Sequence, residues 1–390
     1  MAAQKPNPQI ANSAMPRVFL LSGQELATLR TVGASDSRRL QVVRVAVAAA
    51  DHAMSEGPFS VMQKTVTPPS GDKHDYMSQA PYFWPDPSKP NGLPYIRHDG
   101  QHNPEIRKIS DHEEFLRMGD VVRTLALASY LTGNSAYANR AVQLLRAWFL
   151  DPATKMNPNL EFAQGIPGIN TGRGTGIIES RALVPVVDAI GLLDGSPAWT
   201  KDDQEGMHAW LAAYLHWLQS SDHGIAESNA KNNHGSWYDL QVASLELFLG
   251  DRAAGVQTLE NVKTKRIAVQ IEPDGRQSLE LVRTNAWGYS NFNLDPLTKL
   301  ATMAEKEGVD LWNYRTVDGR SIRAAIDFLA PYATGEKKWD YQQIGGFHAD
   351  AILPTLERAA KAYHNPKYAA LAEKLRGGRE NIEDLLLSDE

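Results

Sequence analysis

Apolar residues recur along this chain at spacings of three and four, and the helices that this pattern predicts come in pairs joined by short glycine turns. One apolar stripe contains Val121, Leu125 and Leu131 and ends at Gly133, and the run Ser110–Glu113 before it predicts a capping box. Alternating apolar and polar positions, which indicate strands, are rare. Other helices are predicted near 35–55, 135–150, 178–194, 201–220, 238–250, 252–267, 291–306, 320–332, 350–363 and 366–376.

The succession of helical hairpins has no strict repeat period, so a regular solenoid is not indicated. We expect an all-α fold, an incomplete (α/α) toroid of about six or seven helical hairpins with long loops over a central cleft. A plain helical bundle is the alternative. Residues 18–377 are expected to form this single domain, between a disordered or extended N-terminal segment, 1–17, and a C-terminal tail, 378–390.

Long stretches without helical periodicity interrupt the pattern at 56–109, 152–177 and 268–290. Loops of this length inside a compact domain are usually functional or disordered, and these contain too many aromatic residues for disorder. We expect the first loop, 56–109, to cover the cleft.

Aromatic and basic side chains gather in the first two loops, which favours a binding site for an acidic sugar. A flat ring packs on the apolar face of a sugar, while arginine or histidine meets its carboxylate. The alternative for the first loop is a rigid plug at one end of the toroid. The second loop is rich in glycine but lacks the Gly-Lys-Ser/Thr end of a phosphate-binding loop. The predicted substrate-binding residues in these loops are His74, Tyr76, Tyr82, Trp84, Arg97, Arg173 and Arg181.

The composition of the chain limits the kinds of molecule that it is expected to bind. Forty basic residues against forty-six acidic ones give a net charge of −6, which argues against a nucleic-acid binder with a basic face. The chain has no cysteine, and its eleven histidines show no HExxH pattern, so we expect neither a catalytic metal nor another cofactor. We expect the protein to be a monomer. We expect its partner to be an anionic polysaccharide.

No run of the sequence approaches the length of a membrane span. The first residues are polar and do not resemble a signal peptide, although the chain could be the mature form of an exported protein. We expect a periplasmic location, with the cytoplasm as the alternative.

The segment KNNHGSWYD and the later segment ELVRTNAWGYSN carry the candidate catalytic residues Asn233, His234, Arg283 and Tyr289. This carboxamide, imidazole, guanidinium and phenol suit removal of a proton from the carbon next to a carboxylate. Such a proton is weakly acidic while the carboxylate stays ionised, so donors must first stabilise the enolate-like state. Trp237 beside this segment and His348 in GGFHAD are further candidates for substrate contact.

The Asn-His pair, the run Glu280–Arg283 and the following tyrosine resemble the alginate lyase superfamily of toroidal polysaccharide lyases, over residues 18–365. The loop HDYMSQAPYFWPDP with RGTGIIESR is most similar to polysaccharide lyase family thirty-eight. The resemblance implies cleavage of 1,4-linked uronic acid polymers, alginate or glucuronan, by β-elimination. It implies that Asn233 and Arg283 neutralise the carboxylate, that His234 is the catalytic histidine and that Tyr289 protonates the leaving oxygen. In the sequence, the tyrosine follows the arginine at a shorter distance here than in the alginate lyases of family five.

For mannuronate or glucuronate, the hydrogen on C5 and the oxygen on C4 lie on the same side of the ring, so one phenol can act as base and then as acid. Arg283 is expected to lower the pKa of Tyr289 and favour this phenolate. His234 is the alternative base, or a helper that holds the phenol and the carboxylate. For guluronate the two groups lie on opposite faces and require separate residues.

Two other functions remain open from the sequence. A toroidal glycoside hydrolase acting on uronic-acid oligosaccharides would need two carboxylates across the scissile bond. Its candidates are Glu179, Asp239, Glu280 and Asp295. A non-catalytic uronan-binding protein would keep the aromatic and arginine residues without needing the phenol.

Overall fold

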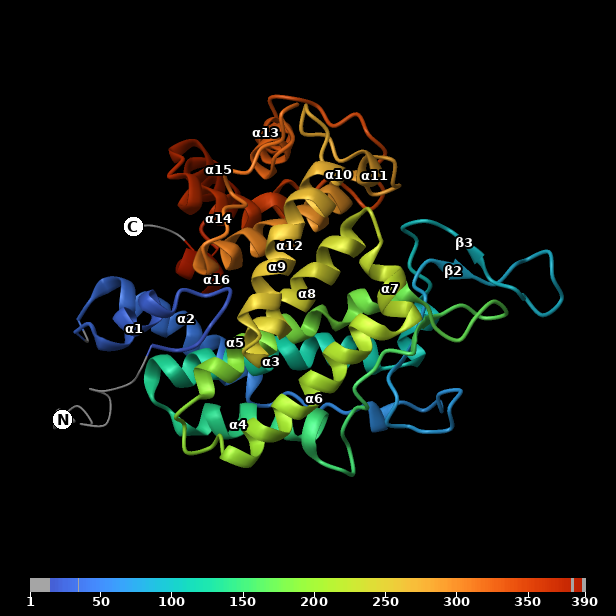
Figure 1. The fold of residues 1–390 in the computed structure, drawn as a ribbon, viewed down its shortest axis with the longest axis horizontal. Coiled ribbons are helices and arrows are strands. Elements are labelled where there is room, and N and C mark those ends of the chain that lie inside the picture. Colours follow the sequence, from blue (N-terminus) through green and yellow to red (C-terminus); the bar gives the residue numbers. More distant parts are fainter. Residues whose placement is uncertain (1–14, 34, 380–381, 388–390) are drawn as a thin grey trace.

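A computed structural model describes residues 15–33, 35–379 and 382–387. Most of these residues are helical, which confirms the predicted all-α class (Figure 1). The expected N-terminal segment, 1–17, falls outside the described residues apart from its last three positions. In the ranges described, no helix combines the length and apolar character needed to cross a membrane.

The inner layer is a series of helices that pack on one another in chain order, α3 on α5, α5 on α8, α8 on α12 and α12 on α14. Residues 235–248 of α8 are all buried, as expected for a helix that has neighbours on every side. The bounds of the inner helices are α3 Asp111–Thr132, α5 Leu183–Leu193, α8 Asn233–Leu249, α12 Ala286–Glu307 and α14 Leu353–Tyr363.

The outer layer packs helix by helix on the inner one. Helices α2 and α4 contact α3, α6 and α9 contact α8, α13 contacts α12, and α15 contacts α14. Gly133 and Gly250 end α3 and α8 with positive φ, which a glycine adopts readily, and each allows a tight turn into the next outer helix. The bounds are α2 Ser37–Ala53, α4 Ser135–Leu145, α6 Lys201–Ser220, α9 Arg252–Val262, α13 Ile322–Thr334 and α15 Pro366–Arg376.

Alternation of inner and outer helices gives the toroid that the hairpin pattern predicts. The remaining short helices lie at its ends and seam. Helix α1 packs on α3, and α16 lies between α14 and α2, so part of the expected tail, 378–390, is a packed helix. The bounds of these and of the short helices near the loops are α1 Gly23–Thr31, α7 Asp222–Ser228, α10 Ala268–Gln270, α11 Ser278–Leu281 and α16 Ile382–Leu387.

The long loops contain short elements of their own. Strand β1 (Met77–Gln79) pairs in parallel with β4 (Phe162–Gly165), which ties the first loop to the second. Strands β2 (Phe83–Trp84) and β3 (Ile96–Arg97) form a hairpin that projects from the body beside α7 (Figure 1). The short turns are the 3₁₀ segments η2 Val61–Gln63, η3 Pro104–Lys108, η5 Gly174–Ala182 and η7 Ala349–Ile352, and the π turns η4 Arg146–Leu150 and η6 Lys263–Ile267.

Helices α8 and α12 begin five residues before the positions 238 and 291 that periodicity predicts. Their first turns are polar, so the apolar stripe starts only later. A capping bond defines the start of α12, because the Asn285 side chain accepts the N–H of Gly288, whereas the first N–H of α8 donates to Glu280. The capping box predicted at Ser110 is wrong, since this residue is already in helical conformation and its hydroxyl caps nothing.

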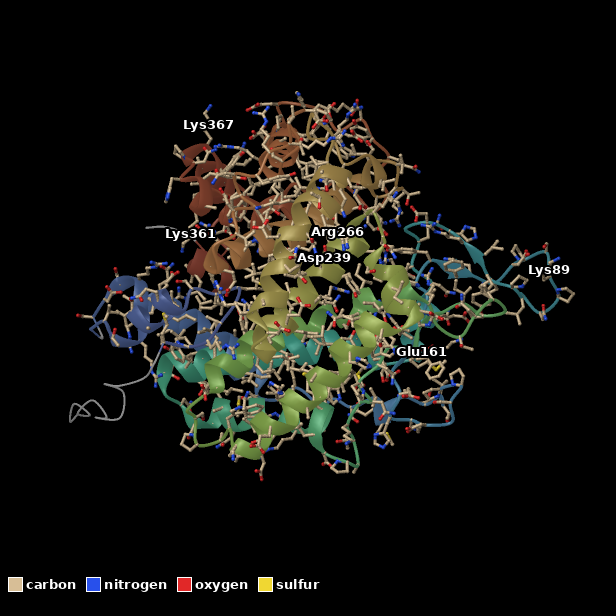
Figure 2. All side chains as sticks on the ribbon, in the orientation of Figure 1. Lys89, Glu161, Asp239, Arg266, Lys361 and Lys367 are labelled. Carbon is tan, nitrogen blue, oxygen red and sulfur yellow. The ribbon has the colours of Figure 1, made fainter. Side chains whose placement is uncertain are left out.

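A buried ion pair joins the outer and inner layers beneath the catalytic segment. Arg266 of η6 binds both carboxylate oxygens of Asp239 in α8, at 2.7 and 2.9 Å (Figure 2). The same guanidinium donates to the carbonyls of Ser228 and Ala230, just before α8 begins. A side chain at Gly235 would collide with this guanidinium, which explains the glycine there. The pair therefore fixes where α8 starts.

We expect Asp239→Ala to lower the free energy of unfolding by about 3–5 kcal/mol, because it leaves the Arg266 charge buried without its partner. Urea denaturation followed by circular dichroism measures the change. Lys201→Ala, which removes one half of the exposed Lys201–Glu205 pair, is the control and should leave the midpoint nearly unchanged. Equal midpoints for the two variants would contradict the proposed role of the buried pair.

Candidate active site

The loops and the first turns of α8 and α12 surround a cleft of about 360 Å³. The cleft brings together segments that lie up to two hundred residues apart in the chain. The four candidate catalytic residues all line it, and so do side chains from both long loops. The lining residues that concern the chemistry are Tyr82, Arg97, His102, His112, Gln164, Arg173, Thr175, Glu179, Arg181, Asn233, His234, Arg283 and Tyr289.

His234 lies in the first turn of α8 and is held by a buried carboxylate. Its Nδ1 is 2.6 Å from Oε1 of Glu227 in α7, a residue that is 2% exposed. This pairing assigns the ring proton to Nδ1, because the carboxylate can only accept. In the neutral ring, Nε2 is then the nitrogen with a free lone pair, the one that can accept a proton.

Asn233, the preceding residue, is fully buried and bound to Glu280 of α11. Its backbone N–H and its side-chain amide donate to this carboxylate at 2.7 to 3.0 Å. Burial raises the pKa of Glu280, and the bonds from Asn233 oppose the shift. The expectation that the Asn233 amide donates to a substrate carboxylate needs correction, since its N–H groups already bind Glu280.

Tyr289 lies in the first turn of α12, and its hydroxyl donates to the Tyr82 hydroxyl at 2.6 Å. Burial and Tyr82 together raise the pKa of Tyr289 above its ordinary value, and the nearby Arg283 opposes this with a smaller effect. The expectation that Arg283 lowers the pKa of Tyr289 overall is therefore wrong. The phenol is neutral at pH 7.

Arg283 stacks on the ring of Tyr289, with its guanidinium carbon 3.6 Å from the ring centroid. Its Nε and Nη2 bind Asp99 of the first loop at 2.7 to 3.1 Å, so its ionic partner is this residue and not Glu280. Burial alone would raise the pKa of Asp99, but the bonds from Arg283 and Thr284 outweigh burial and hold the pKa below its usual range. The Asp99 clamp is therefore intact at neutral pH.

Two further arginines line the cleft from the loops. Arg173 donates to the Gln164 side chain at 2.7 Å, and its guanidinium lies over the Phe83 ring. Gln164 has a positive φ of 51°, a strained conformation for a residue with a side chain and one that clusters at functional sites. Arg97 of β3 lines the same side of the cleft. This side is the basic wall of the site.

Sequence reasoning missed several polar residues of the cleft. His112, at the start of α3, and Thr175 each carry a buried atom, Nε2 and Oγ1, that has no partner among the residues described. His102 stands beside them, and burial followed by the neighbouring His112 lowers its pKa. None of these residues belongs to a short motif. The only indication of Glu227 in the sequence is its position, seven residues before His234.

The structure does not place every predicted substrate-binding residue in the cleft. Tyr76 is wholly buried and donates to Glu179, so it has no ring face left for a sugar, and that expectation is wrong. His74 instead binds the Lys155 carbonyl. Outside the cleft lining are His74, Tyr76, Trp84, Trp237 and His348, whereas Tyr82, Arg97, Arg173 and Arg181 are part of it.

The carboxylates that a glycoside hydrolase would need are already engaged. Glu179 accepts from Tyr76 and Ser78, and Asp239 binds Arg266. Glu280 binds the Asn-His segment, as described above. Asp295 binds Lys299 and Arg358 in a different cavity. In the described portion of the chain, no group of three His, Cys, Asp or Glu residues is arranged to hold a metal ion.

Comparison with known proteins identifies the family of the chain. The alginate lyase family matches residues 60–339. The crystal structure of an alginate lyase from Bacteroides ovatus is 39% identical, with a TM-score of 0.90 over 96% of this chain and 100% of that one. No curated protein matches the chain.

Two structures of alginate lyase A1-III from Sphingomonas species A1 are more distant. One covers 99% of this chain and 100% of that one at 16% identity and a TM-score of 0.59. A histidine-to-alanine variant of alginate lyase A1-III, complexed with a tetrasaccharide, covers 99% of each chain at 16% identity and a TM-score of 0.60. At this identity they show the shared fold alone. The family match and the relative with 39% identity identify the protein as a polysaccharide lyase. The chain belongs to the alginate lyase family.

We expect Asp99→Asn to lower kcat/KM for polymer cleavage by about 100-fold, because Arg283 and the Tyr289 ring beneath it lose their fixed position. Initial rates of cleavage measure the effect. Asp86→Asn, a partly exposed position in the same loop and outside the cleft lining, is the matched control and should keep the wild-type rate. The clamp would have no catalytic importance if both variants cleaved at equal rates.

Proposed function

We propose that this lyase cleaves 1,4-linked uronic acid polymers by β-elimination, and that its substrate is alginate containing mannuronate. The main support is the placement of His234, Arg283 and Tyr289 around one cleft although they come from separate segments. A relative with 39% identity is named an alginate lyase, which favours this polymer over glucuronan. A polymer of this kind does not cross membranes, so we also propose that the protein works outside the cytoplasm.

Arginine side chains neutralise the substrate carboxylate in this proposal. Arg283 has its Nη1 left over, since Nε and Nη2 bind Asp99 and no described residue accepts from Nη1. Arg173 and Arg97 of the basic wall are placed to meet the carboxylates of neighbouring sugar units. One well-placed donor of this kind accelerates such a reaction by roughly 100- to 1000-fold. Asn233, bound to Glu280, has the role of positioning the first turn of α8.

His234 is the base and Tyr289 the acid in the reaction that we propose. The Nε2 of His234 takes the proton from C5, and Glu227 stabilises the imidazolium that forms. The electron pair left on C5 forms the C4–C5 double bond as the C4–O4 bond breaks. Tyr289, which is neutral because its pKa is raised, gives its proton to O4. The C5 hydrogen and O4 of mannuronate share one face, so both groups can act from one side.

The start of α8 gives a further advantage to an anionic intermediate. Asn233 and His234 occupy its first turn, where the helix dipole favours negative charge. Charge that develops on the substrate carboxylate in the transition state is stabilised there. The helix start therefore supports the arginine donors in the same step.

We predict that the wild-type protein releases unsaturated products from poly-mannuronate faster than from poly-guluronate or glucuronan. Tyr289→Phe should reduce the rate by about 100-fold or more, because the leaving oxygen loses its proton donor. Absorbance of the new C4–C5 double bond follows the reaction. Tyr314→Phe, outside the cleft, is the control. Products without this absorbance would instead indicate hydrolysis.

The assignment of acid and base predicts a distinct pH dependence. The raised pKa keeps Tyr289 protonated below about pH 10, so its role as acid gives kcat/KM no alkaline fall between about pH 8 and pH 10. A phenolate acting as the base would instead make kcat/KM rise about tenfold per pH unit over this range. Stopped assays in overlapping buffers measure the profile.

A variant tests the base directly. His234→Ala should lose roughly 100- to 10,000-fold in rate, and added imidazole should restore part of it by taking the missing position. His216→Ala, on the exposed face of α6, is the control. If kcat/KM rose between about pH 8 and pH 10 and the His234→Ala variant stayed active, the base would be Tyr289 instead.

A further inference from the structure

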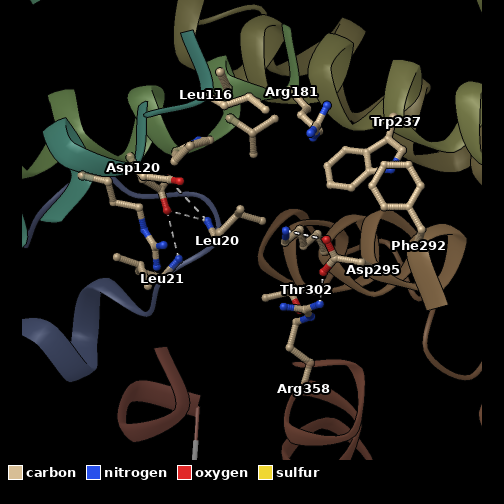
Figure 3. Close-up of a pocket in the computed structure, with 16 residues that line it drawn as sticks. Leu20, Leu21, Leu116, Asp120, Arg181, Trp237, Phe292, Asp295, Thr302 and Arg358 are labelled. Carbon is tan, nitrogen blue, oxygen red and sulfur yellow. Dashed lines mark hydrogen bonds and ion pairs between the residues drawn. The ribbon is translucent and has the colours of Figure 1, made fainter. Parts of the chain in front are cut away.

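A second cavity of about 340 Å³ adjoins the catalytic cleft (Figure 3). Helix α12 shows how the two are related. Tyr289 lines the cleft, Phe292 lines both, and Asp295, Lys299 and Thr302, at successive helical turns, line the second cavity. Arg181 is the other residue common to both linings. Arg181 and Phe292 therefore form the wall between the candidate active site and a cavity with no assigned role.

Arg181 presents a charge to this cavity without a matching carboxylate. Its Nη1 donates to the carbonyl of Ile178, and its guanidinium carbon lies 5.9 Å from the Phe292 ring centroid. Figure 3 shows the guanidinium turned toward the cavity. Within the ranges that the structure describes, no acidic side chain forms an ion pair with Arg181. An unpaired cation away from bulk water is costly, so an anionic ligand would be stabilised here.

The opposite side of the cavity also carries excess positive charge. Lys299 and Arg358 both bind Asp295, so two cations meet one carboxylate. Asp188, another acidic residue of the lining, accepts the backbone N–H groups of residues 19–21. Asp120 and Arg123 also line the cavity, so its lining carries four cationic side chains and three acidic ones.

Aromatic side chains form the face between these charges. The rings of Trp237 and Phe292 lie 5.3 Å apart, and Lys299 stands 5.2 Å from the Trp237 ring. Trp237 is 5% exposed, and its indole N–H has no acceptor among the side chains and carbonyls described. An apolar ring face beside cationic groups suits a sugar ring that bears a carboxylate.

We propose that this cavity binds one uronate monosaccharide, with its carboxylate on the Arg181 guanidinium and its ring against Trp237 and Phe292. The volume is at the lower end of small-molecule sites, which fits one sugar unit. The choice of a uronate rests on the proposed function, since that reaction produces uronate units next to the shared wall. The anion site itself rests on the charges and the cavity.

Titration of the full-length, ¹⁵N-labelled protein with glucuronate tests the proposal through the Trp237 indole N–H signal, assigned with Trp237→Phe. We expect a saturable shift with a dissociation constant in the millimolar range. Glucose, which lacks the carboxylate, should give no such shift at equal concentration and ionic strength. Either no shift with glucuronate or an equal shift with glucose would overturn the proposal.

Variants of Thr302, which lines this cavity and not the catalytic cleft, separate the two sites, since glucuronate can also bind in the cleft. Thr302→Trp fills the cavity and should abolish the shift, whereas Thr302→Val, which keeps the volume, should retain it. Arg181→Met removes the charge without adding volume and should weaken binding by about tenfold or more. Circular dichroism and thermal unfolding show whether each variant is folded. A shift that persists in folded Thr302→Trp and Arg181→Met variants would place the ligand elsewhere.

Failure of this proposal and failure of the proposed reaction give different results. The titration reads binding and needs no turnover. Glucuronate binding at Trp237 without release of unsaturated product would contradict the reaction and leave the cavity site standing. Release of unsaturated product without a shift of the Trp237 signal would support the reaction and contradict the cavity site.

Discussion

Carboxylates hold the candidate catalytic side chains in place at and just before the first turns of two inner helices. Glu227 fixes the His234 ring and Glu280 fixes the residue before it. Asp99 fixes Arg283, and through it the ring of Tyr289. A carboxylate in the interior is stable only with such donors around it. The acids and the catalytic groups therefore stabilise each other, and the toroid serves to bring their loops together.

This arrangement explains which features of the fold follow from the sequence. The paired helices, their glycine turns and the toroid are encoded locally in apolar periodicity, and the structure confirms them. The polar first turns of α8 and α12 carry no such period, so their starts were placed too late. Their boundaries depend on bonds to Glu280 and Asn285. Contacts of this kind join distant segments and leave no local pattern.

The four candidate catalytic residues could be predicted from sequence motifs and from their chemistry. The residues that hold them in place could not. Asn233, His234, Arg283 and Tyr289 converge on one cleft. Their partners Glu227 and Asp99 were missed, because a buried acid looks the same in a sequence as an exposed one. Tyr76 was misread for the same reason, since an aromatic residue in a loop can serve the core. Burial also decides the sign of the Tyr289 pKa shift. The narrower family, thirty-eight, stays a prediction.

The hydroxyl pair of Tyr82 and Tyr289 implies that the resting cleft is already hydrogen-bonded in the pattern that catalysis needs. A glycosidic oxygen that arrives at Tyr289 replaces one oxygen acceptor by another, so this exchange contributes little net affinity. Discrimination among polymers then falls to the groups that meet the carboxylates and ring hydroxyls along the basic wall. In the proposed reaction, the same acid can therefore serve many uronans, and the loops around it select the polymer.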